Sequence, residues 1–210
     1  LRELIAQVQA DHRETKIGLT GLPVMENDEM RVSQVSMMEA SLISLVGVAC
    51  LFVAGFGGLR HPLMTVATLL LAMAWSFGYI TLAVGHLNIL SISFGVILIG
   101  LGIDFGVHYV ARYLQLHASI RSTKEALVRT AQGVGPGIFT GAVTTAIAFF
   151  TAGLTDFTGV AELGLIAGGG ILLCLLAALT VLPAMIHQAD QKRTHEVLPA
   201  PLDIHGCLRP

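Results

Sequence analysis

Five long apolar segments, separated by short polar connections, constrain the fold of this chain more than any other feature. They span residues 40–56, 63–84, 89–114, 138–154 and 160–186. A helix of about 20 apolar residues crosses a bilayer whose hydrocarbon core is about 30 Å thick. Only helices and closed barrels satisfy all backbone polar groups there. The pattern therefore predicts an all-α membrane protein, a bundle of five transmembrane helices.

The composition agrees with this class. Hydrophobic residues make up 54% of the chain and charged residues 12%, about half the charged share of a soluble domain. We therefore predict no soluble enzyme activity, and no nucleic-acid partner because no basic patch with interleaved aromatic residues is present. Two of the three cysteines, Cys50 and Cys174 but not Cys207, lie inside apolar segments. No disulfide framework, metal site or cofactor is expected.

The segment 89–114 carries one acid, Asp104, well inside an apolar run. An ionised carboxylate at mid-bilayer costs at least about 2.5–3.5 kcal/mol on insertion scales. Gly100 and His108 lie one turn to either side on the same helix face, and Gly102 and Gly106 flank that face. Removal from water favours the neutral carboxyl, so Asp104 is a candidate protonatable group on an ion path.

Two simpler interpretations of these polar residues stay open. Asp104 can serve only as a hydrogen-bond acceptor that holds neighbouring helices together. His108 can relay a proton, pair with Asp104, or be an ordinary buried histidine. Thr144 and Thr145 of the segment 138–154 are possible hydrogen-bond partners, but their facing cannot be derived from the sequence.

Small residues indicate how the helices pack. Three pairs of glycines lie four residues apart: Gly102 with Gly106, Gly137 with Gly141 and Gly164 with Gly168. Such pairs allow close approach of membrane helices. The run 168–170 predicts either close contact or a flexible point. GLGIDFG at 100–106 is no dinucleotide-binding motif, because Phe105 breaks its glycine spacing and the motif lies inside a span.

The polar connections are expected to hold three kinds of structure. Arg60, His61 and Pro62 form a tight connection, and residues 85–88 and 155–159 form short turns. The segment 115–134 is expected to form an amphipathic helix on the membrane surface that GVGPG at 133–137 breaks.

The chain is predicted to divide into three parts. Residues 37–187 form the membrane domain, preceded by 1–36 and followed by a tail, 188–210. In the first part, Gly21, Pro23 and the pair Asn27–Asp28 indicate a turn. The chain begins at Leu1 without a methionine, and we expect it to be a piece of a larger protein.

The basic residues predict the orientation in the membrane. Those of the first and third connections and of the tail all fall on one side: Arg60, Arg112, Arg121, Lys124, Arg129, Lys192 and Arg193. The other two connections contain no Lys or Arg. By the positive-inside rule the first set is cytoplasmic. We therefore expect a multi-pass protein of the inner membrane, with an extracytoplasmic N-terminal segment and a cytoplasmic tail.

Two stretches resemble a known family. NILSISFGVILIGLGIDFGVHYVARY at 88–113 and TDFTGVAELGLIAG at 155–168, within the five-span layout, resemble the resistance-nodulation-division (RND) superfamily. The mycobacterial membrane protein large (MMPL) branch, and the hopanoid-associated RND transporters within it, are most similar. Members of the family have two halves with six spans each. The resemblance implies that the five segments of this chain are spans two to six of the first half. Residues 1–36 would then end an extracytoplasmic porter domain.

The resemblance also implies a function. Members export lipids or other hydrophobic molecules, driven by protons, and the acid of the fourth span takes part in the proton relay. Here Asp104 would carry that role, with Gly100 as its motif partner. The second six-span half of the transporter, which this chain does not include, would be its structural partner. Relatives often place a second acid or a tyrosine after this acid, whereas this chain has Phe105.

Two other classes of function share parts of this pattern. One is a lipid-binding regulatory module similar to sterol-sensing domains, which share the five-helix core and the Gly-x-x-x-Asp feature at Gly100 and Asp104. The other is a helper of protein export similar to SecD and SecF, to which the sequence FGVHY at 105–109 is a poor fit.

Overall fold

The computed structural model describes residues 8, 20–56, 58–86, 93–120 and 122–190. It contains the helices α2 (Leu22–Phe56), α3 (Arg60–Ala83), α5 (Phe94–His117), α6 (Thr123–Ala152) and α7 (Thr158–Asp190). Each is long and apolar enough to cross a membrane, and none of the described residues forms a strand. The predicted all-α, five-helix fold is confirmed.

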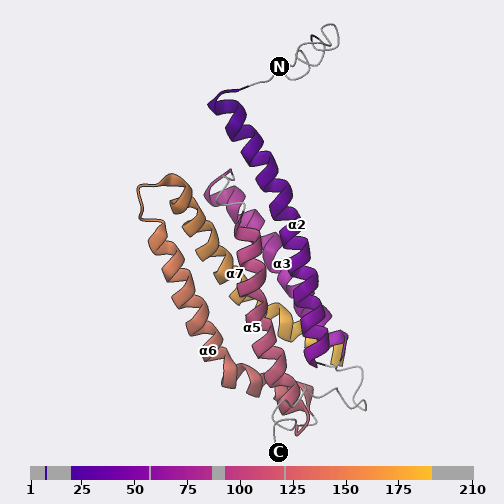
Figure 1. Ribbon diagram of the computed structural model, residues 1–210. Helices are drawn as coiled ribbons and strands as arrows, with labels where there is room; N and C mark the ends of the chain where they lie inside the picture. The colour runs from indigo at the N-terminus through magenta and orange to yellow at the C-terminus, as the bar shows by residue number, and fades with distance from the viewer. Residues whose placement is uncertain (1–7, 9–19, 57, 87–92, 121, 191–210) are drawn as a thin grey trace, which may run out of the picture.

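The helices run alternately up and down, so the start of α2 and the end of α7 lie at opposite ends of the bundle (Figure 1). The α2–α3 connection, the α5–α6 connection and the end of α7 share one end. We call this the basic end, because Arg60, Lys124 and Arg129 belong to it.

Helix α5 is central to the bundle. It contacts all four other helices, whereas α2 contacts only α3 and α5, and α6 only α5 and α7, among the described residues. The most apolar 18-residue window of α7 is 61% buried, and that of α2 is 6% buried. The core therefore lies around α5 and α7, and α2 leaves most of its apolar surface uncovered.

The glycine run 168–170 of α7 lets three aromatic rings approach the helix. Gly168 meets Phe150 of α6, Gly169 meets Tyr79 of α3, and Gly170 meets Phe94 of α5. A Cβ atom at any of the three positions would overlap the ring. Close contact, rather than a flexible point, thus explains the run.

The glycines at 102, 106 and 164 also lie against neighbours. A Cβ at Gly102 would come 2.9 Å from the Cys174 sulfur, one at Gly106 would overlap Thr65, and one at Gly164 would overlap the backbone of α6. Side chains at these positions would push the helices apart.

Helix α6 differs from the expectation. It is continuous from Thr123 to Ala152, with Pro136 inside it, so the predicted break at 133–137 is wrong. The Ser122 side chain caps the start of α6 by accepting from the Glu125 amide at 3.4 Å. The first turns are packed on the bundle, since Ala126 and Thr130 are fully buried. Pro136 removes only one backbone donor, and buried turns on both sides hold the helix together.

Helix α2 begins earlier than the predicted span. Gly21 has a positive φ of 128°, and Pro23 lies in the first helical turn, where proline is tolerated. The predicted turn at Asn27–Asp28 is wrong, because both residues are helical. Residues 24–46 contain neither glycine nor proline, so nothing in this stretch stops the helix.

Two further boundaries move outward. Arg60, His61 and Pro62 form the first turn of α3 rather than a connection. Helix α7 passes through Pro183 and ends at Asp190, so residues 188–190 of the expected tail are helical. Three stretches lie outside the described residues. They are the rest of that tail, nearly all of residues 1–19, and residues 87–92, which cover the end of the predicted turn at 85–88 and the expected start of the third span.

Candidate functional site

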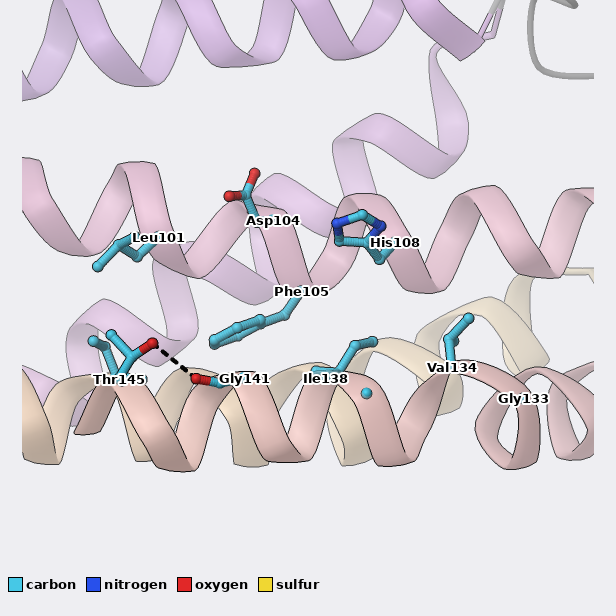
Figure 2. Close-up of a pocket in the computed structure, with 11 residues that line it drawn as sticks. Leu101, Asp104, Phe105, His108, Gly133, Val134, Ile138, Gly141 and Thr145 are labelled. Atoms are coloured by element: carbon cyan, nitrogen blue, oxygen red, sulfur yellow. Dashed lines mark hydrogen bonds between the residues drawn. The ribbon is translucent and has the colours of Figure 1, made fainter. Parts of the chain in front are cut away.

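A cavity of about 540 Å³ opens between α5 and α6. We call it the α5–α6 groove (Figure 2). Its lining is mostly apolar or glycine, with one acid and one histidine: Leu101, Asp104, Phe105, His108, Gly133, Val134, Gly137, Ile138, Gly141, Thr145 and Ile171. Two of the sequence-predicted residues, Asp104 and His108, therefore lie in one site.

Asp104 lies near the middle of α5, roughly 15 Å from the helix start at 1.5 Å per residue. It is exposed, and Figure 2 shows its carboxylate directed away from α6. No described residue forms a hydrogen bond or ion pair with it. Within the described chain, Asp104 is therefore not a structural acceptor that holds helices together.

The two threonines considered as partners bond elsewhere. Thr144 and Thr145 each donate a hydrogen bond at 2.8 Å to a backbone carbonyl of their own helix, those of Thr140 and Gly141. This bonding leaves the Asp104 carboxylate without a hydroxyl partner from α6.

His108 lies one turn from Asp104 on the same exposed side of α5. No ion pair joins the two within the described residues. One turn further, Arg112 is also exposed and donates to the side chain of Gln115 at 3.3 Å. The three side chains form a polar row that leads from the middle of the bundle to its basic end.

Phe105 contributes an apolar wall. Its ring points across the groove towards α6, as does the side chain of Leu101 (Figure 2). The residue that follows the acid thus packs between helices and has no group that can exchange a proton.

The glycines of the groove differ from those of the core. A Cβ at Gly137 or Gly141 would meet no other atom within 4 Å. The same holds for Gly100, which lies one turn before Asp104 on α5 but does not line the groove. Packing inside this chain therefore explains Gly102, Gly106, Gly164 and Gly168 but not these three. They leave the face around Asp104 open.

Sequence reasoning missed a second polar cluster, at the basic end. Arg60, His61, Tyr113 and Asp190 meet there, from α3, α5 and α7. Its only local signal is polar residues at the ends of apolar runs, which is ordinary in membrane helices. Among the described residues, no group of His, Cys, Asp and Glu side chains is suited to hold a metal ion.

The MMPL family model matches residues 1–196. The chain belongs to the MMPL family. It is 32% identical to the hopanoid transporter HpnN of Burkholderia multivorans and 27% identical to that of Rhodopseudomonas palustris, each over 81% of this chain. A putative membrane protein of Methanocaldococcus jannaschii is 26% identical over 80% of this chain and 43% of its own length.

The chain spans about a fifth of the two HpnN proteins, 19% and 20% of their lengths. The predicted relation to hopanoid-associated RND transporters of the MMPL branch is confirmed. The relatives named for a function are transporters, in agreement with the prediction that this MMPL chain is not an enzyme.

Proposed function

We propose that this five-helix MMPL unit forms spans two to six of one six-span membrane half of an exporter of lipids or other hydrophobic molecules, driven by protons through Asp104. The observation that carries the proposal is the position of Asp104, which lies at mid-helix, exposed in the α5–α6 groove and unpaired within the described residues. An acid in this position gains or loses a proton without breaking a structural contact. A neutral Asp104 tolerates an apolar surrounding that a charged one does not.

The open face around Asp104 needs a cover inside a membrane. Lipid tails cannot hydrate a carboxylate, so a second protein surface or water must face it. We assign this role to the second half of the transporter, which would pack on the open edges of α5 and α6. We assign to His108 the role of passing a proton along α5, a role that Phe105 cannot take because it has no exchangeable proton.

The relatives support the substrate class. Two are named hopanoid transporters, and hopanoids are lipids. The mostly apolar groove and the uncovered side of α2 suit contact with hydrophobic molecules and membrane lipids. In the proposed orientation the basic end is cytoplasmic, the membrane is the inner membrane, and residues 1–36 end a porter domain outside the cytoplasm.

The proposal predicts that lipid delivery depends on a proton gradient. The full-length transporter, reconstituted in vesicles with a fluorescent lipid, should move the lipid when a pH gradient is imposed and stop when a protonophore is added. If the lipid binds the protein equally with and without the gradient but is never moved across the vesicle membrane, the result would instead favour the regulatory, sterol-sensing-like module.

The groove itself provides a second prediction. Replacing Gly137 by leucine should leave the protein folded, because a Cβ there meets nothing within 4 Å. The larger side chain should fill part of the groove and lower lipid delivery about tenfold. A tenfold effect is equivalent to ~1.4 kcal/mol, which is at the lower end of the cost of adding a side chain to a packed contact. Normal delivery by Gly137→Leu would show that the groove is not used.

A further inference from the structure

The polar cluster at the basic end joins the ends of three helices. The Asp190 Oδ2 atom accepts a hydrogen bond from the Tyr113 hydroxyl at 2.7 Å and lies 3.1 Å from His61 Nε2. Its Oδ1 atom lies 3.0 Å from an Arg60 guanidinium nitrogen. Asp190 is 4% exposed, His61 3% and Tyr113 0%. One buried carboxylate of α7 therefore holds the start of α3 and the end of α5.

The cluster also extends towards α6. The Tyr113 ring lies 5.8 Å from the His61 ring and 5.3 Å from the His117 ring, measured between centroids. The His117 Nε2 atom lies 3.4 Å from the hydroxyl of Thr123, the first residue of α6. Four helix ends thus meet around Tyr113.

Tyr113 and Asp104 lie on opposite sides of α5. They are nine positions apart, roughly two and a half turns of an α-helix. Tyr113 is fully buried and Asp104 is exposed in the groove. Any rotation of α5 about its axis that releases Tyr113 from Asp190 would therefore also change the position of Asp104 relative to the groove.

Most other contacts of α5 are apolar and do not have the directionality of a hydrogen bond. Leu98 and Ile103 are buried, and the side chains of Thr65 of α3 and Cys174 of α7 pack closely against Gly106 and Gly102. The Tyr109 hydroxyl donates to the Leu127 carbonyl of α6 at 3.3 Å, a neutral and longer bond than that of Tyr113. A hydrogen bond to a carboxylate is about twice as strong as a neutral one.

We propose that Asp190 is a positioning residue: through the Tyr113 hydroxyl it sets the rotation of α5 that presents Asp104 and His108 to the groove. The importance of this rotation rests on the proposed function of Asp104. The rotation itself can be measured without any transport.

Cysteine labelling of the full-length protein in its membrane tests the inference. In a background without native cysteines, single reporters are placed by His108→Cys, on the groove side, and by Val110→Cys, at a position that is 0% exposed in the native protein. N-ethylmaleimide reacts with the hydrated thiolate, so the ratio of the two labelling rates, position 108 over position 110, reports which side of α5 faces water.

This labelling ratio should fall about tenfold in Asp190→Ala and in Tyr113→Phe, the shift expected when one charge-assisted hydrogen bond is lost. The double variant should show no further change, because both substitutions remove the same bond. Asp190→Asn should restore most of the ratio, since its amide oxygen still accepts from Tyr113. Glu125→Gln, which breaks an exposed ion pair with Arg129 at the same end, should not change it.

An unchanged ratio in Tyr113→Phe, at normal protein amount, would overturn the inference, and this variant decides the case if Asp190→Ala fails to fold. A fall of equal size in Glu125→Gln would also overturn it, since it would show that any disturbance of the basic end has the same effect. If Asp104 proves dispensable for export, the proposed function fails, but the labelling ratio still tests the positioning role.

Discussion

Replacing Asp104 by asparagine in the full-length transporter is expected to stop proton-driven lipid delivery without unfolding the protein. Asparagine has nearly the same shape but cannot take up or release a proton. One proton moving down 100 mV supplies about 2.3 kcal/mol, which sustains roughly a 50-fold lipid gradient. Because Asp104 is exposed and unpaired within the described residues, its replacement should change stability by less than about 0.5 kcal/mol.

The measurement is delivery of labelled lipid under an imposed pH gradient, with the amount of inserted protein determined in parallel. Asp156→Asn is the matched control, because Asp156 is an exposed acid in the α6–α7 turn, outside the groove. The control should transport normally. If Asp104→Asn also transports at the wild-type rate and still responds to a protonophore, Asp104 does not couple proton movement to export.

Replacing Gly169 by leucine is expected to destabilise the bundle strongly. A Cβ at this position would overlap the Tyr79 ring, so α3 and α7 would have to separate. Displacing the ring would also break the hydrogen bond that the Tyr79 hydroxyl donates to the Leu165 carbonyl at 3.4 Å. Overpacking costs about 1–3 kcal/mol and the lost bond about 1 kcal/mol more.

Heating the detergent-solubilised protein and measuring the fraction that stays monodisperse would quantify this effect. We expect the midpoint for Gly169→Leu to fall by roughly 5–15 °C, at 2–4 °C per kcal/mol for a domain of this size. Gly137→Leu adds the same side chain to a glycine with no neighbour within 4 Å and should melt as the wild type. Equal melting of the two variants would contradict the packing described for the glycine run.

Much of the fold was predictable because the hydropathy of membrane helices is a local property. A run of apolar residues long enough to cross the bilayer forms a helix whatever surrounds it. The boundaries were less predictable, because they depend on contacts. Pro136 and Pro183 suggested a break and a nearby helix end, yet α6 and α7 continue through them because buried residues on both sides keep the turns in place.

The candidate site was predictable in part. An acid inside an apolar run is rare enough to be recognised, and helical spacing places His108 beside Asp104. The cluster around Asp190 was not predictable, because its carboxylate lies 129 positions from His61 and 77 from Tyr113. Nothing in the local sequence indicates that these side chains meet.

The sequence by itself determined the class, the five helices and the acid deep inside the third span, because these follow from the free energy of placing each residue in lipid or water. Only the tertiary structure decided the roles of glycines with the same spacing. Gly164 and Gly168 lie against α6, whereas Gly137 and Gly141 line the groove. It also decided that Asp190 holds Tyr113. The reason is physical: spacing along a helix specifies a face, and only the neighbouring helices determine whether that face is covered.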